Sequence, residues 1–561
     1  LRGLPPDTTL VLVNGKRRHR AAVITLLGGG IADGAQGPDI STIPTIALKQ
    51  VEVLRDGAAA QYGSDAIAGV INFELKDYAE GGSIEARLGQ YFEGDGDSYD
   101  LAANWGLPLG NNGFVNLSFE YKESDNTSRS QQHSGAQALI DAGNPHRYAA
   151  SQYLTNPNYA STFHPNTMIW GAPEFDHDYK FFANFGTNLS DNVEIYGHTN
   201  YAKRRVEGGF FYRNPHTRSQ LFDGPDNVMI DGVMYAETVK VADLDGIDGV
   251  DDMGMPIIRG TSCEPIGIVD NIPVESHITR VIMDDNCESF LTRFPGGFVP
   301  RFGGEMDDRS LAVGVRGDLG NWYGDLSAVW GQHKADFFMR HTLNPQLLAK
   351  PGIDVANIPT DYNPGAYTET DYTINLDLSR GFDIGAFAGP VNVAFGLEYR
   401  QEEFEVSQGG EGSWFQDLTP GGLTTQGFST GSNGFTGFGP RLVGTWSRDS
   451  YAAYVDLEGE ITDVLTVGVA GRYEDHDDVG DTADFKLTAR LQFTDSFAVR
   501  GAVSTGFRAP TVGQANLLNV TTAFTDGMLA DEATLPPTHP ASVLVGGKAL
   551  TPEESTNYTI G

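Results

Sequence analysis

The chain has 561 residues, which exceeds one ordinary hydrophobic core, so several domains or one large barrel are expected. Apolar residues make up 40% of it. The absence of any run of about 18 apolar residues excludes a membrane-spanning helix but leaves a membrane β-barrel open, because a barrel strand needs apolar residues only at alternate positions. The formal net charge of −36 disfavours nucleic acid as a partner, since its phosphates would be repelled.

The first 76 residues predict a small α+β domain. Residues 9–13 (TLVLV) read as a strand, and Asn14-Gly15 is a hairpin turn signal. A basic cluster follows at residues 16–20 (KRRHR), and then a glycine triplet at residues 28–30. The triplet is no phosphate-binding loop, because no Gly-Lys-Ser/Thr follows it and no strand-to-helix context surrounds it.

Residues 51–73 (VEVLRDGAAAQYGSDAIAGVINF) join this domain to the rest of the chain. A short apolar strand stops at Asp56-Gly57, a dipeptide suited to a tight turn. Small residues then allow close backbone packing, and residues 70–73 read as a second strand. Two strands around a small-residue turn predict a tightly packed plate.

From about Gly82 the hydrophobic period becomes two. At residues 115–121 (VNLSFEY) apolar side chains alternate with polar ones, which places one face against lipid and the other toward a lumen. Similar alternation occurs at residues 193–201, 311–315, 391–399 and 485–493. This counting gives about 14 strands, read with an uncertainty of one.

The connections between these strands separate a membrane barrel from a soluble sandwich, which has the same period. Short turns near residues 108–113, 190–192, 317–321, 462–463 and 494–495 alternate with long excursions near residues 123–178, 206–308, 341–371, 407–447 and 508–552. Outer-membrane barrels have this asymmetry of short periplasmic turns and long extracellular loops.

Several motifs resemble those of the TonB-dependent outer-membrane receptors, in the order found in that family. Residues 51–73, with the lead-in at residues 39–50, are similar to the end of the family's plug domain, and residues 2–4 and 9–17 to an earlier plug strand. Residues 505–510 (TGFRAP) and 550–558 (LTPEESTNY) are two further motifs far downstream. The resemblance therefore spans almost the whole chain.

The resemblance implies an all-β fold: a transmembrane antiparallel β-barrel of 22 strands, about 14 of them present here, with an N-terminal α+β plug domain in the lumen. Residues 1–76 would be a partial plug, and residues 82–561 a partial barrel with long extracellular loops. The last strand begins near Glu553 and stops at Gly561 without a terminal aromatic residue. We therefore expect the final strands and the TonB box, which binds TonB, to lie outside this sequence; the lack of a signal peptide says nothing against export.

The function implied is TonB-dependent active uptake of a scarce large nutrient across the bacterial outer membrane. A siderophore-type chelate, cobalamin and an oligosaccharide are the ligand classes considered. The expected partners are the TonB complex of the inner membrane, an extracellular small-molecule or glycan ligand, and outer-membrane lipid. The alternative is a passive or adhesive surface barrel without energised transport, which leaves the plug unexplained. The sequence contains no nucleophile-elbow pattern and no zinc-type histidine spacing, so it does not predict an enzyme. We expect that no cofactor is required.

Two groups of residues are candidates for ligand contact. The basic residues Arg18, His19 and Arg20 lie in a part of the plug that reaches toward the outside in the resembled family; the alternative is plug-to-wall ion pairing or solvation. The aromatic clusters beside the predicted outer loops could stack on a ligand, although loop packing uses the same residue types. These aromatic residues are Phe210, Phe211, Tyr212, Trp414 and Phe415.

Glu52, Arg55 and Asp56 are the candidates for a plug gate, because charges that face a narrow lumen are costly unless paired. Arg55 is the strongest candidate, since its planar fork can hold one or two carboxylates. Its expected partners on the wall are Glu120, Glu398 and Glu402; the alternative is that Arg55 is solvated at the periplasmic side.

The long loop at residues 206–308 carries two further predictions. Cys263 and Cys287 are the only cysteines, and in an exported protein we expect them to form a disulfide. An acidic turn packs five carboxylates among glycines, which suits Ca²⁺ but lacks the regular spacing and the Glu of an EF-hand. The alternative is a solvated acidic turn. The carboxylates belong to Asp243, Asp245, Asp248, Asp251 and Asp252.

Overall fold

The computed structural model covers both the plug and the wall. It describes residues 1–561 apart from 27–29, 128, 130–132, 145–170, 245–246, 251–255, 259–262, 355–357 and 526–527.

The plug is a four-stranded sheet in the order β2-β1-β4-β3. Its strands are β1 (Thr9–Val13), β2 (Lys16–Arg17), β3 (Leu48–Leu54) and β4 (Gly69–Leu75). β1 pairs with β4 in parallel, and the other neighbours are antiparallel. Asn14 and Gly15 both have positive φ, at 48° and 76°, as the predicted hairpin turn requires. The 3₁₀ turns η1 (Pro6–Thr8), η2 (Gly30–Ala32), η3 (Ile40–Thr42) and η4 (Thr45–Ala47), and the short helix α1 (Ala59–Tyr62), complete the plug.

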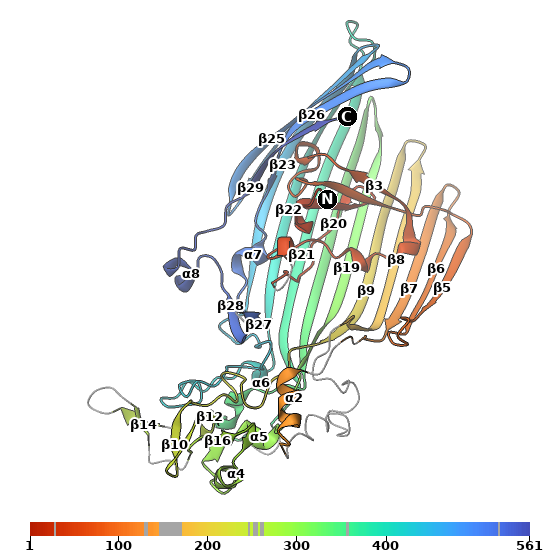
Figure 1. The fold of residues 1–561 in the computed structure, drawn as a ribbon. Coiled ribbons are helices and arrows are strands. Elements are labelled where there is room, and N and C mark those ends of the chain that lie inside the picture. The colour runs from red at the N-terminus through yellow and green to blue at the C-terminus, as the bar shows by residue number, and fades with distance from the viewer. Residues whose placement is uncertain are drawn as a thin grey trace.

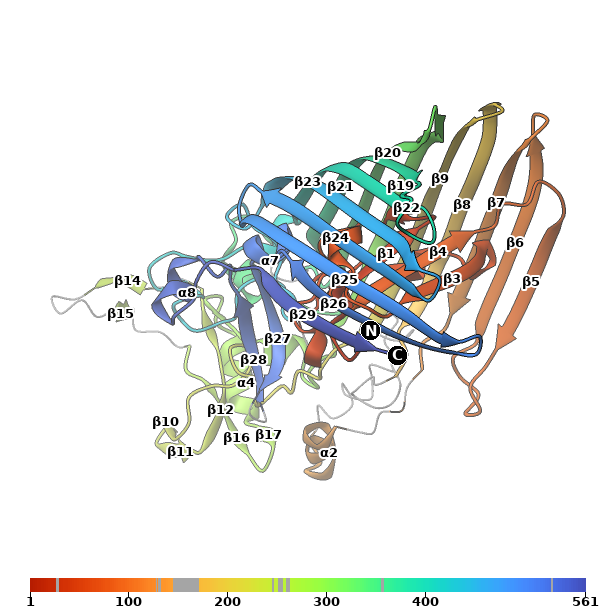
Figure 2. The ribbon, with the colours of Figure 1, turned by 90° about the horizontal axis from the view of Figure 1, so that it is seen from above.

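The rest of the regular structure is dominated by one antiparallel sheet of fourteen strands, the number that the alternation predicted. We call this sheet the wall. Its strand order runs from β29 through β26–β19, β9 and β8 to β5, and it curves around the plug (Figures 1 and 2). The total of 22 strands stays a prediction. The wall strands are β5 (Gly82–Gly89), β6 (Ser98–Leu109), β7 (Gly113–Ser124), β8 (Glu174–Ser190), β9 (Val193–Gly209), β19 (Arg301–Leu319), β20 (Trp322–Arg340), β21 (Tyr362–Phe382), β22 (Val391–Gln408), β23 (Gly444–Thr462), β24 (Leu465–His476), β25 (Gly480–Thr494), β26 (Phe497–Arg508) and β29 (Glu553–Ile560).

The two faces of the wall differ in chemistry, as the period of two predicts. On β7 the side chains of Asn116, Ser118 and Glu120 are buried on the inner face, toward the plug. Phe119 lies on the outer face and is 42% exposed. In the described part of the chain, no helix is both long and apolar enough to cross a membrane.

The long connections gather at one end of the wall, which also carries the short β24–β25 turn, and the other end carries short turns (Figure 1). The loop elements are α2 (Ser134–Asp141), β10 (Val228–Ile230), β11 (Val233–Tyr235), β12 (Glu237–Val239), β13 (Ala242–Asp243), β14 (Ile247–Val250), β15 (Pro256–Ile258), β16 (Ile266–Val269), β17 (Ile272–Pro273), α4 (Glu275–Ile282), β18 (Cys287–Glu288), α5 (Phe290–Arg293), η5 (Pro345–Ala349), α6 (Glu411–Trp414), α7 (Val512–Asn516), β27 (Asn519–Thr525), β28 (Met528–Thr534) and α8 (Pro540–Leu544).

Three of these loops share a hydrophobic core, which we call the cap. Phe222, Ile266 and Phe290 come from the β9–β19 loop, Leu348 from the β20–β21 loop and Phe428 from the β22–β23 loop, and all are buried together. The loops therefore form one packed layer over this end of the wall.

Candidate functional site

The basic cluster that follows β1 is directed into the wall. Arg18 is buried, and its Nη2 lies 2.5 Å from Oδ1 of Asp308 on β19. Its Nη1 donates to Asn200 and Ser310 at 2.8 and 2.9 Å. His19 Nε2 lies 2.8 Å from the other carboxylate oxygen of Asp308. One inner-face carboxylate thus holds two consecutive plug side chains.

His19 fits against the wall because position 331 of β20 is a glycine. A Cβ at Gly331 would overlap the His19 imidazole ring. Burial lowers the pKa of His19, Arg18 lowers it further, and Asp308 opposes both effects. The net direction is downward, so the neutral imidazole donates from Nε2 to Asp308.

Arg20 connects the plug to a second group of wall charges. Its Nη2 lies 2.7 Å from Asp65 Oδ2 within the plug, its Nη1 pairs with Glu402 on β22, and its backbone N–H donates to Asp371 on β21 at 3.3 Å. Arg17 also reaches Asp65, at 3.0 Å. Burial alone would raise the pKa of Asp65, but Arg20, Arg17 and other arginines bring it below its ordinary value, so Asp65 is a carboxylate here.

Glu402 lies at the centre of this group, which we call the plug–wall cluster: Arg20 and Asp65 of the plug with Asp371, Arg400, Glu402 and Arg448 of the wall. Glu402 accepts from Arg448 at 2.5 Å and lies 3.0 Å from Arg400 in an ion pair, and Arg400 also donates to Asp371 at 3.3 Å. All six side chains are buried.

The neighbouring Glu369 accepts from Gln36 of the plug at 3.1 Å. Glu369, Asp371 and Glu402 bring carboxylate oxygens within 4.8 Å of one another, a spacing that could hold a metal ion. The guanidinium groups of Arg20, Arg400 and Arg448 already supply positive charge to the last two of them. Arginine side chains of the wall and the plug therefore already neutralise Asp371 and Glu402.

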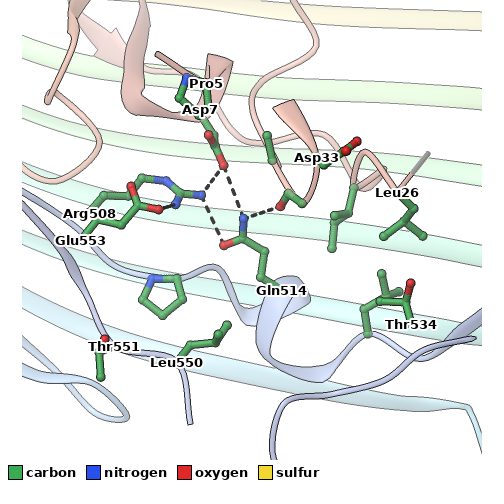
Figure 3. Close-up of a pocket in the computed structure, with 15 residues that line it drawn as sticks. Pro5, Asp7, Leu26, Asp33, Arg508, Gln514, Thr534, Leu550, Thr551 and Glu553 are labelled. Carbon is green, nitrogen blue, oxygen red and sulfur yellow. Dashed lines mark hydrogen bonds and ion pairs between the residues drawn. The ribbon is translucent and has the colours of Figure 1, made fainter. Parts of the chain in front are cut away.

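A further junction brings together the two downstream motifs. Arg508 ends β26, Glu553 begins β29, and the two are paired residues whose side chains lie 2.9 Å apart. Arg508 also pairs with Asp7 of the plug, and Gln514 Nε2 donates to the Gly34 carbonyl at 2.6 Å (Figure 3). These contacts border a pocket of about 350 Å³ that Ile24, Leu26, Pro510, Leu517 and Leu550 make largely apolar. The first motif therefore attaches the wall to the plug through Arg508, and the second supports that contact through Glu553.

Arg55 corrects a prediction from the sequence. Its side chain is exposed, and among the described residues it makes no ion pair. The proposed partners are engaged elsewhere: Glu120 pairs with Lys180, Glu398 lies 3.2 Å from Arg472, and Glu402 pairs with Arg20. The reason is position, because Arg55 follows β3 at an exposed point of the plug, whereas residues 18–20 are buried against the wall.

The other two gate candidates make polar contacts. Glu52 accepts from Asn72 and Gln50, both at 3.0 Å and both within the plug. Asp56 accepts from the hydroxyl of Thr559 on β29 at 2.7 Å and is thus the one of the three that contacts the wall through a hydrogen bond in the described part of the chain.

The aromatic candidates take part in loop packing. Tyr212 is buried and donates to the Gly296 carbonyl at 2.7 Å, and Arg213 lies over the Phe210 ring at 5.1 Å. Trp414 Nε1 donates to the Gly409 carbonyl at 3.0 Å, and Lys350 lies over Phe415 at 5.6 Å. Phe210 and Phe211 also line a pocket of about 260 Å³, where contact with a ligand stays a prediction.

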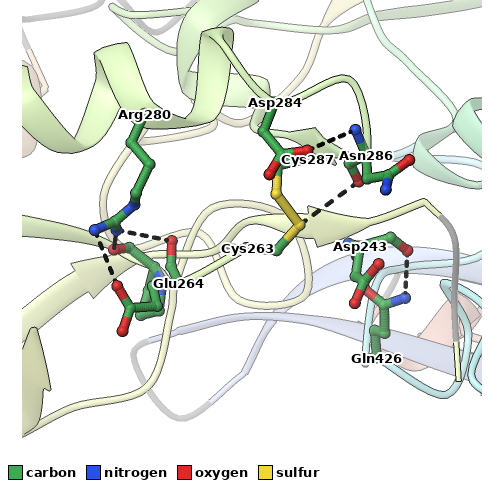
Figure 4. Close-up of a disulfide and its surroundings, with 9 residues drawn as sticks. Asp243, Cys263, Glu264, Arg280, Asp284, Asn286, Cys287 and Gln426 are labelled. Carbon is green, nitrogen blue, oxygen red and sulfur yellow. Dashed lines mark hydrogen bonds and ion pairs between the residues drawn. A yellow bond between two sulfur atoms is a disulfide. The ribbon is translucent and has the colours of Figure 1, made fainter. Parts of the chain in front are cut away.

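The cap contains the disulfide between Cys263 and Cys287, whose Cα atoms are 5.2 Å apart (Figure 4). Asp243 lies nearby, and its backbone N–H and carbonyl both bond the Gln426 side chain, at 3.0 and 2.8 Å. Of the other calcium candidates, Asp245, Asp251 and Asp252 lie outside the described residues, and only the backbone of Asp248 is described. The calcium site stays a prediction.

Sequence reasoning missed most of the wall side of this interface. Asp308, Asp371, Arg400 and Arg448 received no role, although all four occupy polar inner-face positions on strands of period two. Opposite charges at inner-face positions of neighbouring strands are the signal that could have identified these four residues.

Comparisons with known proteins agree with this geometry. Residues 1–70 match the model of the TonB-dependent Receptor Plug Domain, and residues 288–561 match that of the TonB dependent receptor-like β-barrel. The vitamin B12 transporter BtuB of Vibrio vulnificus is 27% identical over 248 residues, 43% of this chain and 35% of the relative. The probable TonB-dependent siderophore receptor PirA of Acinetobacter baumannii is 35% identical over 112 residues, 19% of this chain and 15% of the relative.

The crystal structure of the siderophore receptor PirA from Acinetobacter baumannii has the same fold. It superposes with a TM-score of 0.56 at 17% identity, covering 100% of this chain and 61% of that one. The ferric enterobactin receptor PfeA of Pseudomonas aeruginosa superposes with a TM-score of 0.55 at 14% identity, over 100% and 62% of the two chains. The chain thus spans about three fifths of the solved receptors and matches about a third or less of the curated relatives.

Proposed function

Because this chain belongs to the TonB-dependent receptors, we propose that it imports a scarce nutrient across the bacterial outer membrane by TonB-dependent active uptake. The ligand class we propose is a siderophore-type chelate or cobalamin, the classes that the names of the relatives carry. The observation that carries the proposal is the plug held against the inner face of the wall by buried ion pairs.

In this proposal the wall spans the outer membrane, and the long loops and the cap face outward. A ligand enters among the loops and reaches the outward side of the plug. TonB, drawing on the inner-membrane proton gradient, then displaces the plug, which opens a path along the inner face. The role of the chain is binding and gating rather than bond-making.

The polar character of the plug–wall contact supports gating. Both partners of each ion pair are charged groups that water can solvate when the plug moves away. An apolar contact of the same area would expose hydrophobic surface on both sides during every cycle of transport. A passive or adhesive barrel has no use for such a separable contact.

Uptake measurements on the full-length protein test the proposal. A deletion strain complemented with the gene is supplied with radiolabelled ferric siderophores or with cobalamin, in backgrounds with and without TonB. We expect one class to accumulate only when both the gene and TonB are present. Accumulation that is independent of TonB would favour a passive barrel, and no gene-dependent accumulation of either class would contradict the ligand assignment.

A further inference from the structure

A β-bulge on the wall brings three metal-ligating side chains together on β7 and β8. Lys122 pairs with Asp178 and Ser124 pairs with Phe175, so Glu123 on β7 lies opposite two residues of β8, Asp176 and His177, one more than a regular ladder places there. Bulges of this kind often re-aim a side chain and are kept as specific features of a fold.

His177 is left out of the ladder on both sides. On the β9 side, Asp176 pairs with Arg205 and the next pair is Tyr179 with Lys203. The φ of His177 is 53°, a left-handed conformation that is uncommon outside glycine. The His177 side chain therefore projects from the sheet at a point where the neighbouring strands β7 and β9 continue.

The three ligand atoms are close to one another and accessible. One carboxylate oxygen of Glu123, one of Asp176 and a ring nitrogen of His177 all lie within 4.8 Å of one another. Asp176 and His177 contact each other, and the side chains are 36% and 67% exposed. Small side-chain rotations are enough to bring such groups to about 2.1 Å from a common ion.

The surrounding charges leave these carboxylates available. Arg205, which pairs with Asp176 in the ladder, directs its guanidinium to Glu207 at 3.1 Å and to Glu305 at 3.8 Å. On β7, Tyr121 donates its hydroxyl to Glu123 and so fixes one oxygen of that carboxylate. A hydrogen bond from a second residue commonly orients a metal-ligating carboxylate.

We propose that Glu123, Asp176 and His177 form a binding site for a divalent first-row transition ion of the Zn²⁺ type. Imidazole nitrogen combined with carboxylate oxygen suits zinc, whereas Ca²⁺ and Mg²⁺ take oxygen ligands. With three protein ligands at an exposed position, the ion keeps an open place for water or an anion. The site lies on the outer face of the wall, two residues beyond Tyr121 toward the long loops.

Zinc binding by the full-length receptor in detergent tests this site. Isothermal titration with Zn²⁺ alone is expected to show one saturable site on the wild type. His177→Asn keeps a residue that tolerates positive φ but removes the imidazole, and Glu123→Gln keeps the shape but removes the charge. Each is expected to weaken binding by at least about tenfold, since loss of an outer-shell partner alone costs that much.

His539→Ala is the matched control, because His539 precedes α8, a loop helix in another part of the chain. It is expected to leave zinc affinity unchanged, and excess Ca²⁺ is expected not to displace zinc. Binding that His177→Asn and Glu123→Gln leave intact, or that Ca²⁺ abolishes, would overturn the proposal, as would no saturable binding by the wild type. Far-ultraviolet circular dichroism of each variant checks that the strands are retained.

Discussion

Arg20→Ala is expected to loosen the plug, because Arg20 is the plug cation that enters the plug–wall cluster. The substitution removes the pairs with Asp65 and Glu402. Breaking a buried ion pair by removing one partner costs roughly 3–5 kcal/mol. Asp65 keeps Arg17, and Glu402 keeps Arg400 and Arg448, so the lower end of that range applies.

A cost of about 3 kcal/mol raises the population of a displaced plug by roughly two orders of magnitude, since each tenfold change corresponds to 1.36 kcal/mol. In cells this is measured as sensitivity to a large hydrophilic antibiotic that the closed receptor excludes. In purified receptor it is measured as the rate of limited proteolysis within the plug. Energised uptake of the ligand is expected to fall, because displacement of a loosened plug is no longer coupled to TonB.

Arg55→Ala is the matched control, since it also removes an arginine of the plug but one that is exposed. Surface substitutions of this kind usually change stability by less than about 0.5 kcal/mol. Arg20→Lys keeps the charge but cannot form the same two-sided contact, so an intermediate effect is expected. Equal antibiotic sensitivity and equal proteolysis of Arg20→Ala and Arg55→Ala, at equal expression, would refute the role of the cluster.

Three further predictions concern His19, Gly331 and the disulfide. Burial keeps the folded-state pKa of His19 below its unfolded value of about 6.5, so the contribution of the neutral imidazole to plug stability is complete above that pH. As pH falls below it, protease protection of the plug should decline by up to about 1.4 kcal/mol per pH unit, and His19→Gln should reduce that slope; an unchanged slope would contradict the assignment. Gly331→Ala should push the His19 ring off Asp308 and increase plug proteolysis, whereas Gly385→Ala, where an added Cβ meets no atom within 4 Å, should spare the plug. Mass spectrometry without reductant should find Cys263 and Cys287 oxidised, and replacing both by Ser should cost the cap about 3.5 kcal/mol for this separation of 24 residues; free thiols in the wild type would contradict it.

The sequence was most informative where structure is determined locally. The alternation at residues 115–121 predicted the inner and outer faces of β7, and Asn14-Gly15 predicted the turn between β1 and β2 of the plug. Both could be predicted because a period of two and a positive φ need only a few neighbouring residues. The cysteine pair could be named because the chain has only two cysteines.

Contacts between the plug and the wall depend on distances that the sequence does not contain. Asp308 is 290 residues from Arg18, and Glu402 is 382 residues from Arg20. Which plug residue meets which wall strand depends on how the plug is rotated within the curved sheet. Arg55 and Arg20 are both plug arginines near tight turns, and only the fold assigns Arg20 to the wall and Arg55 to the exposed edge.

The bulge at His177 shows the same limit on a smaller scale. A strict period of two assigns each residue of β8 to one face, and one extra residue breaks that assignment without changing the composition. The sequence HDY at residues 177–179 gives no sign of which residue leaves the ladder. His177 was therefore assigned to the long loop before β8, and its closeness to Glu123 emerged only from the paired strands.

The arrangement of charge across the interface explains how one contact can be both firm and separable. In place, the six side chains of the plug–wall cluster balance one another, so none is left as an unpaired buried charge. When the plug moves, Arg20 and Asp65 leave together, and Arg17 travels with them. The wall keeps Asp371 and Glu402 with Arg400 and Arg448, which again balance. Within the cluster, Arg20 with Asp65 carries no net charge, and neither do the four wall side chains. Moving the plug therefore needs water to enter the interface but separates no net opposite charges between the two halves of the cluster.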